Sequence, residues 1–391
     1  MRPLRLRNLD MMTLTGLVVM SISISIPGFL SVRETRISAG LPVNLLDVSP
    51  VGFLFFVLLG TAIFSLSLTR HSFYTGLLGG LVPVAGFFVT GLRATAIAAE
   101  VGPFSRVSPA AGLWLLVFSG YVLVFGARKK LKDRRELAAL LVLVPISLTL
   151  LMLVSGHLNG LSIMKEFANR RTRFFEETAR HLIIAGGAVF FGSLIGIPLG
   201  ILAKRSNRVE KPVFAFVNFM QTIPSVALFG LLIAPLSYLS RSIPFLRQLG
   251  ISGIGWTPAM IALVLYSLLP ITRNTYASLK TIPHDTIEAG IGMGMSRLQI
   301  LSKIEIPMAL PVVLAGVRTA AIQAVGNTTM AALIGAGGLG VFVFQGLGQA
   351  AMDLVLLGAL PIVALALIVD SFMQLLIALL TPRGLVMEEG K

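Results

Sequence analysis

The residues with the clearest capacity for polar chemistry gather in one stretch of an otherwise apolar chain. This stretch, TIEAGIGMGMSRLQILSKIEIPMALP, runs from Thr286 to Pro311. Its charged residues are Glu288, Arg297, Lys303 and Glu305, and its glycines are Gly290, Gly292 and Gly294. A helix formed here is expected to carry charge at Arg297 and Lys303 and to have an apolar surface made of Ile291, Leu298, Ile300, Leu301 and Ile304. Such a segment either docks a soluble partner or lies as an amphipathic linker on a membrane surface, and the local pattern leaves both open.

Patterns for catalysis or metal binding are missing from the sequence. The absence of cysteine excludes disulfides, thiolate metal sites and cysteine nucleophiles. Four histidines (His71, His157, His181 and His284) show no metal-ligand spacing. There is also no H-E-x-x-H and no G-x4-G-K-[ST] motif. We therefore expect no catalytic residue, no metal, no cofactor and a role other than that of an enzyme.

Capping signals predict that the polar stretch forms two short helices joined at a glycine hinge. These signals are Asp285 with Glu288, and Ser296 with Gln299. Between them, Gly292 and Gly294 permit a tight turn that a Cβ atom would hinder. Pro307 is expected to stop one element just before the next apolar span begins.

The composition places the chain in a membrane. Hydrophobic residues make up 55% of it and charged residues only 13%, with a mean hydropathy of +0.88. Soluble domains carry roughly 45–50% apolar and about 25% charged residues. The apolar runs are long and continuous rather than short and alternating, which favours helices over a β-barrel. We predict an all-α polytopic membrane protein.

About ten transmembrane helices are expected, because a bilayer core takes about 20 apolar residues per helix. The predicted spans are 11–30, 50–69, 73–92, 109–127, 137–156, 181–203, 213–237, 256–275, 308–328 and 354–380.

The positions of lysine and arginine predict that both termini are cytoplasmic. The net charge of +15 arises in short loops beside apolar spans, where it sets topology, so nucleic acid is not an expected partner. With the N-terminus inside, the inner segments hold most of the 32 Lys and Arg residues, including the runs ARKKLKDRRE and AKRSNRVEK. The outer loop 157–180 is the main exception, and we expect it to lie as an amphipathic helix on the outer surface. The segment 276–307 then faces the cytoplasm.

Three regions are predicted along the chain. Residues 1–157 form an N-terminal membrane extension of about five spans, 158–180 the outer amphipathic loop, and 181–391 a second membrane region of about five spans. Arg2, Arg5 and Arg7 before the first apolar run imitate a signal peptide. No A-x-A-like site follows promptly, so an uncleaved first span is expected.

The polar stretch resembles a loop of known form. Permease subunits of ATP-binding-cassette (ABC) importers carry an inner loop E-A-A-x3-G-x9-I-x-L-P. Here the same spacing joins the segments 288–290, 294 and 304–307, and five of seven positions match. Gly290 replaces the second Ala, which loosens a helix by about 1 kcal/mol, and Ile306 replaces Leu. By this resemblance, the residues that couple to an ATPase are Glu288, Ala289, Gly290, Gly294, Ile304, Ile306 and Pro307.

Further segments are similar to the permeases of glycine betaine, choline and carnitine importers, the osmoprotectant family. They are 218–232, 265–276 and 310–340, and the likeness covers about 180–380. It implies a type I ABC importer permease core at 181–391, surrounded by membrane lipid in a bacterial inner membrane. The implied partners are a separate ABC ATPase, an extracytoplasmic solute-binding protein, and a second copy or a sister permease. ATP-driven closure of two ATPases would push paired loops together and switch the pore.

Polar residues within the apolar spans are candidates for the transport pathway. Arg318 and Asp370 are costly in a bilayer, so we expect them either to pair as a structural staple or to line the pathway. The other pathway candidates, close to prolines in the spans, are Gln221, Thr222, Gln323, Asn327 and Thr328. Hydrogen bonding between helices is the alternative for these five.

Two groups of glycines are expected to serve structure. Glycines at near-fourfold spacing predict close helix packing; they are Gly186, Gly187, Gly192, Gly196 and Gly200. The run GAGGLG at 335–340 follows no βα unit, so a nucleotide site is not expected. It suits a re-entrant turn or gate near the outer mouth, with a close-packed turn as the alternative.

Two other classes of function predict different residues. An ion-coupled secondary transporter of small polar solutes predicts titratable residues along the midplane, where Arg318 and Asp370 are the main examples. An integral membrane enzyme would need a clustered set of histidines and carboxylates, which the sequence lacks.

Overall fold

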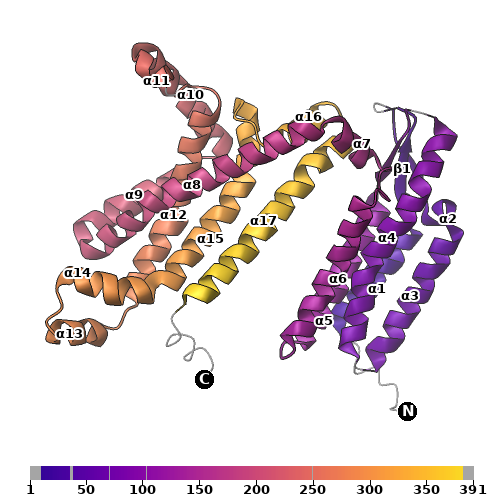
Figure 1. Ribbon diagram of the computed structural model, residues 1–391, viewed down its shortest axis with the longest axis horizontal. Coiled ribbons are helices and arrows are strands. Elements are labelled where there is room, and N and C mark those ends of the chain that lie inside the picture. Colours follow the sequence, from indigo (N-terminus) through magenta and orange to yellow (C-terminus); the bar gives the residue numbers. More distant parts are fainter. Residues whose placement is uncertain (1–9, 36–37, 70, 103, 249, 382–391) are drawn as a thin grey trace. The chain divides into compact units, whose positions relative to one another are not determined.

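The computed structural model describes residues 10–35, 38–69, 71–102, 104–248 and 250–381 (Figure 1). The chain divides into two compact units. Unit 1 comprises Met1–Asn169 and Gln349–Asp353, and unit 2 comprises Arg170–Gly348 and Leu354–Lys391.

Unit 1 is a helical bundle closed at one end by a small sheet. Its longer helices are α1 (Met11–Ser25), α3 (Pro50–Leu68), α4 (Ser72–Val101), α5 (Ala111–Lys130) and α6 (Arg135–Val154). Its short elements are α2 (Leu45–Val48), α7 (Ser162–Asn169), β1 (Leu30–Arg33), β2 (Leu41–Val43) and β3 (Arg106–Pro109).

The three strands form an antiparallel sheet that the sequence did not predict. Their order is β2-β1-β3, with Leu30 opposite Val43 on one side and Pro109 on the other. The β1–β3 pairing joins strands far apart in the chain, and neither strand exceeds four residues. Such short pieces show no alternation pattern long enough to be recognised.

Unit 2 is built around three long helices, α8 (Arg171–Arg205), α12 (Trp256–Lys280) and α15 (Ile306–Ala331). The remaining elements are α9 (Asn207–Thr222), α10 (Ser225–Ser242), α11 (Pro244–Gln248), α13 (His284–Gly292), α14 (Arg297–Ile300), the π-helix η2 (Leu301–Glu305), the 3-10 helix η3 (Ala332–Ile334), α16 (Gly340–Gly348) and α17 (Met352–Leu380).

Glycines let α8 and α12 approach closely. A Cβ atom on Gly200 would lie 2.6 Å from the Cβ of Thr275, and one on Gly196 would lie 3.0 Å from a methyl group of Ile271. The Thr272 hydroxyl also donates a hydrogen bond to the Gly196 carbonyl, at 3.1 Å. The predicted packing role is confirmed for these glycines and for Gly192. It is wrong for Gly186, which faces open space.

Among the described residues, nine helices are long and apolar enough to cross a membrane, and α1 is a shorter apolar helix. The helical membrane fold predicted from composition is therefore confirmed. The predicted first span, 11–30, is too long, because α1 ends at Ser25 and Leu30 already pairs in the sheet.

Three other predicted spans differ from the helices observed. The span 213–237 is two helices, α9 and α10, because Ile223 before Pro224 is extended rather than helical. The span 181–203 begins earlier, since α8 starts at Arg171 and takes in part of the predicted outer loop. The span 308–328 continues a helical run that begins at Arg297.

The glycine run 335–340, here called the glycine loop, is a close-packed turn. Gly337 and Gly338 have left-handed φ values of +85° and +88°. The Gly338 amide donates to the buried Glu177 carboxylate at 2.7 Å, and the Leu339 amide donates to His181 Nδ1 at 3.3 Å. Because Nδ1 accepts, the proton of the neutral ring lies on Nε2, which donates to the Val325 carbonyl at 2.9 Å.

Candidate functional site

The polar stretch folds into a compact helical hairpin, here called the hairpin, between α12 and α15. It consists of α13, a turn and a second arm, which is α14 followed by η2, and it lies at the end of unit 2 where α12 ends and α15 begins (Figure 1). The two predicted short helices are therefore confirmed. Four of the seven motif residues fall in α13 and its turn, and the other three fall in the helical run that leads into α15.

The turn after α13 is closed by hydrogen bonds between near neighbours. The Gly294 amide donates to the Ile291 carbonyl at 2.9 Å, and the Met295 amide donates to the Gly290 carbonyl at 3.1 Å. This pair of bonds is a Schellman motif, which needs a left-handed residue at the first position past the helix. Gly294 supplies it with φ of +76°. A Cβ at this site would meet no atom, so backbone conformation rather than space calls for glycine.

The second short helix starts with the predicted capping box. The Ser296 side chain accepts from the Gln299 amide at 3.4 Å, and the Gln299 side chain accepts from the Ser296 amide at 2.8 Å. The first predicted cap is wrong. Pro283 occupies the N-cap of α13, so Asp285 lies inside the first turn and caps nothing. Gly292 also differs from expectation, because it remains helical and only Gly294 turns the chain.

Gly290, the main departure from the family pattern, is a packing position. It is buried, and a Cβ there would approach the end of the Ile304 side chain at 2.9 Å and the sulfur of Met295 at 3.5 Å. Ile304 therefore packs across the hairpin against α13. Gly290 is expected to loosen the helix α13, but it also lets α13 and Ile304 of the second arm pack closer together.

Pro307 does not stop an element as predicted. The π-helix Leu301–Glu305 leads directly into α15, and Pro307 lies at the start of that helix. A proline has no amide hydrogen, and its ring crowds the carbonyl four residues earlier. The wider π turn before it provides room, so the hairpin's second arm continues rigidly into a membrane span.

Two polar contacts anchor this end of unit 2, and neither pairing was predicted from the sequence. Lys204, at the end of α8, bonds Glu305 in the π-helix at 2.5 Å, and the Glu305 side chain is only 9% exposed. Separately, the Tyr276 hydroxyl donates to Glu210 at 2.6 Å and accepts from Lys280 at 2.9 Å. The hairpin is thereby tied to α8, and α9 is tied to α12.

The outer surface of the hairpin carries large apolar side chains, here called the hairpin patch: Ile291, Met293 and Leu298. They are 59%, 73% and 72% exposed. Glu288 is exposed beside them and pairs with His284 within α13, at 3.1 Å. By contrast, Ile300 and Ile304, which were also expected to give apolar surface, pack inward. The exposed set sits on a rigid support, which is the arrangement of a docking surface.

The five pathway candidates do not form one site. Gln221 donates to the Tyr266 carbonyl at 2.8 Å, and Thr222 donates to the Phe219 carbonyl at 2.7 Å within its own helix. Thr328 is buried and bonds back to its helix. Gln323 is exposed and Asn327 is partly exposed, one helical turn apart on the same face of α15. These last two remain predicted pathway residues.

The two charges inside the spans pair with each other. Arg318 of α15 bonds Asp370 of α17 at 2.5 Å, and Gln374 donates to the second carboxylate oxygen at 2.7 Å. This pairing is the structural alternative expected from the sequence, and it lowers the cost of both charges in a bilayer.

Comparisons with known proteins agree with this geometry. Residues 192–382 match the family "Binding-protein-dependent transport system inner membrane component", and residues 8–164 match "ABC transporter permease YehY, N-terminal domain". The "Osmoprotectant import permease protein OsmW" of Salmonella typhimurium is 41% identical over 53% of this chain and 92% of that protein. The "Glycine betaine/carnitine/choline transport system permease protein OpuCB" of Bacillus subtilis is 37% identical over 54% of this chain and 89% of that protein.

A likeness to a solved structure is weaker. A chain from "Inward facing conformations of the MetNI methionine ABC transporter" is 25% identical, with a TM-score of 0.48, over 54% of this chain and 98% of that chain. A score this low supports no argument from its geometry.

Proposed function

The chain belongs to the binding-protein-dependent permeases of ABC importers, and from this premise we propose that it takes up osmoprotectants such as glycine betaine, choline or carnitine. The proposed solutes are those in the names of its relatives. ATP hydrolysis is assigned to a separate ATPase chain, so this subunit is itself non-catalytic. An extracytoplasmic binding protein delivers the solute, and a second copy or a sister permease completes the pore.

The hairpin patch is the single observation that carries the coupling role. Ile291, Met293 and Leu298 are exposed on a hairpin whose turn, cap and Lys204–Glu305 tie hold it rigid. Buried apolar anchors on a rigid support dominate the energy of protein interfaces. Because α14 continues through the π turn into α15, a push on the hairpin is transmitted to a membrane span without an intervening loop.

The proposed orientation puts both termini and the hairpin in the cytoplasm of a bacterium, with the chain in the inner membrane. It rests on the excess of Lys and Arg in the segments on that side. If α1 is a span, and α9 with α10 forms one broken crossing, the described residues cross the membrane ten times. The domain arrangement follows: unit 2 is the permease core, and unit 1 is an extension.

Transport by reconstituted vesicles tests the coupling role. We expect Leu298→Asp to reduce ATP-driven uptake of labelled glycine betaine more than about tenfold, because a charge replaces an interface anchor. The matched control is Ile254→Asp, which changes a side chain of similar exposure, 63%, outside the hairpin. That control should retain ATPase stimulation in the presence of the ATPase subunit.

Two results would overturn the proposal. Normal uptake by Leu298→Asp would remove the docking role, and uptake driven by a proton gradient without ATP would favour the secondary transporter. The main features in favour of that alternative, the Arg318 and Asp370 charges, are bonded to each other.

A further inference from the structure

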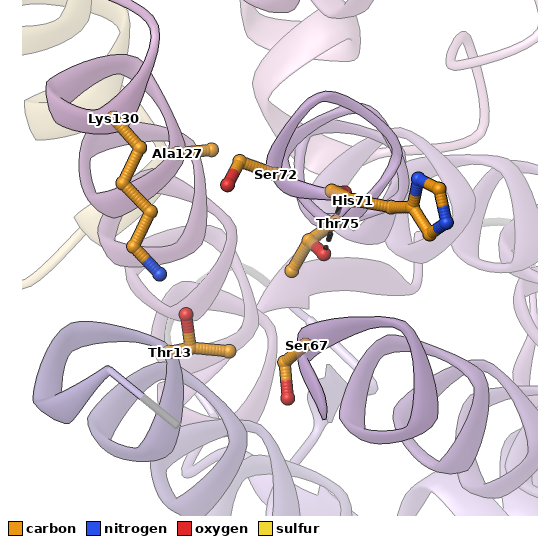
Figure 2. Close-up of a pocket in the computed structure, with 7 residues that line it drawn as sticks. All are labelled: Thr13, Ser67, His71, Ser72, Thr75, Ala127 and Lys130. Carbon is orange, nitrogen blue, oxygen red and sulfur yellow. Dashed lines mark hydrogen bonds between the residues drawn. The ribbon is translucent and has the colours of Figure 1, made fainter. Parts of the chain in front are cut away.

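Unit 1 contains a polar cavity that coupling to an ATPase does not use. It lies at one end of the unit, where α1 and α4 begin and α3 and α5 end, and its volume is about 340 Å³ (Figure 2). The lining residues are Thr13, Ser67, His71, Ser72, Thr75, Ala127 and Lys130. Six of these seven side chains carry a polar group.

The cavity offers an ammonium group and two hydroxyls that can donate hydrogen bonds. The Lys130 ammonium and the hydroxyls of Thr13 and Ser72 face the enclosed space (Figure 2). Thr13 is only 3% exposed, and its hydroxyl, like that of Ser72, has no hydrogen-bond partner among the described residues. The hydroxyls of Ser67 and Thr75 already donate to backbone carbonyls, at 2.6 Å and 3.1 Å.

The local field at the cavity favours an anion. Helix α4 begins here, and its N-cap residue His71 makes no capping bond with its side chain, which turns away from the cavity (Figure 2). The free amides at the start of this 30-residue helix are directed to this end. The carbonyls at the ends of α3 and α5 lie here too and offset the helix dipoles, so the net positive charge at the cavity comes from basic side chains. The last turn of α5 adds Arg128, Lys129 and Lys130, and the neighbouring carboxylate Asp10 lies 3.6 Å from Lys130.

An apolar groove continues from the cavity along the same pair of helices. Its volume is about 300 Å³, and its α1 side is Leu17, Met20, Ser21 and Ile24, whereas its α3 side is Phe56, Val57, Gly60, Thr61 and Phe64. One helical turn separates Thr13 in the cavity from Leu17 in the groove, and Ser67 lies as close to Phe64. From Thr13 to Ile24 the seam is about 16 Å long, at 1.5 Å per residue.

We propose that unit 1 binds an anionic phospholipid, with its phosphate headgroup in the cavity and one acyl chain in the α1–α3 groove. A soluble phosphate would satisfy the donors and leave the groove empty, whereas a lipid uses both. The basic residues around Lys130 also attract an anionic leaflet, at about 1 kcal/mol per residue near the surface. The site lies outside the permease core and does not depend on the proposed solute or on ATPase coupling.

Native mass spectrometry of the full, delipidated chain tests the headgroup. We expect wild-type protein to retain phosphatidylglycerol in preference to phosphatidylcholine, because only the first carries net charge. Lys130→Gln should weaken phosphatidylglycerol binding about fivefold, and the isosteric Thr13→Val should weaken it in the same direction. Lys132→Gln removes an equal charge from an exposed position outside the cavity lining and should leave binding unchanged.

A second pair of variants tests the groove. A Cβ on Gly60 would meet Met20 only at an ordinary contact distance of 3.7 Å, so Gly60→Ala should bind lipid as wild type does. Gly60→Leu fills the groove and should abolish retention of phosphatidylglycerol.

Three results would overturn the proposal. Equal retention of phosphatidylglycerol and phosphatidylcholine would show that the site does not select an anionic headgroup. An equal loss of phosphatidylglycerol binding in Lys130→Gln and Lys132→Gln would show that general surface charge, and not the cavity, attracts the lipid. Competition by inorganic phosphate as strong as by phosphatidylglycerol identifies a soluble anion as the occupant. If Gly60→Leu does not fold, the binding measured for Thr13→Val still tests the headgroup site.

Discussion

The hairpin and the glycine loop are two turns at the two ends of α15, and they differ in how much support they take from distant residues. Both use glycine in the left-handed conformation, at Gly294 in the hairpin and at Gly337 and Gly338 in the loop. The hairpin's turn closes with bonds between residues at most five positions apart. The glycine loop starts with the same local pair of bonds, from the amides of Gly335 and Ala336 to carbonyls three and five residues earlier. Its Gly338 and Leu339 amides, in addition, bond Glu177 and His181, which lie 161 and 158 residues away.

This difference matters for function. A turn that closes on itself keeps its shape with one side uncovered, so the hairpin can present Ile291, Met293 and Leu298 to a partner. The part of the glycine loop at Gly338 and Leu339 relies on distant acceptors, so it keeps its shape only while α8 stays in place. The glycine loop therefore reports any displacement of α8, whereas the hairpin moves as a rigid body with α15.

The largest expected effect follows from removing the loop's distant acceptor. Glu177→Ala should lower the free energy of unfolding by about 2–3 kcal/mol, because the buried Gly338 amide loses its charged acceptor. Hydrogen exchange should rise in a peptide covering 335–345 and stay unchanged in one covering 284–300. Glu176→Ala, at an exposed neighbour, should change stability by less than about 0.5 kcal/mol. If the 335–345 peptide exchanged hydrogen equally fast in Glu177→Ala and Glu176→Ala, Glu177 would not support the glycine loop.

The next largest effect is expected at the long-range ion pair of the hairpin, Lys204 with Glu305. Lys204→Ala leaves the Glu305 carboxylate, 9% exposed, without its cation. We expect a loss of about 2 kcal/mol, below the 3–5 kcal/mol of a fully buried pair, since Lys204 is partly exposed. The thermal unfolding midpoint should fall, and exchange should rise in 301–310 while the turn at Gly294 stays protected. Lys303→Ala, exposed on the same segment, is the control and should have little effect.

Two glycines in the hairpin should respond with opposite signs. Gly294→Ala forces an alanine into φ of +76°, at a cost of about 1–2 kcal/mol. Gly292→Ala places alanine in a helix with open space around its Cβ and should stabilise by about 0.5 kcal/mol. Exchange of the Met295 amide measures both. The same sign for both substitutions would mean that the turn is not the Schellman motif described above.

The smallest effect is expected at Gly290. Restoring the alanine of the family pattern with Gly290→Ala gains helix propensity, but its Cβ would lie 2.9 Å from the end of the Ile304 side chain. That side chain is flexible and can shift, so the two effects should nearly cancel, to within about 0.5 kcal/mol. ATPase stimulation should remain at the wild-type level. A loss of stimulation without loss of stability would show that the hairpin's arms require the closer contact.

Features of the hairpin that depend on bonds between near neighbours could be predicted from the sequence. The Ser296–Gln299 capping box and the turn at Gly294 were readable, because their partners lie within a few residues. Asp285 was misread, since Pro283 sets the start of α13 two residues earlier. The break between α9 and α10 had a local signal in Pro224, but the apolar run around it suggested one continuous span.

The sequence by itself determined that the chain lies in a membrane as helices, where its polar hairpin lies, and how that hairpin turns. Each of these depends on composition or on bonds between near neighbours, which the order of residues specifies directly. Only the tertiary structure decided that Lys204 pairs with Glu305, that Glu177 and His181 hold the glycine loop, and that α1 and α3 leave a groove beside a polar cavity. Those features join residues brought together by packing, and one sequence contains many charges and hydroxyls that could have met instead.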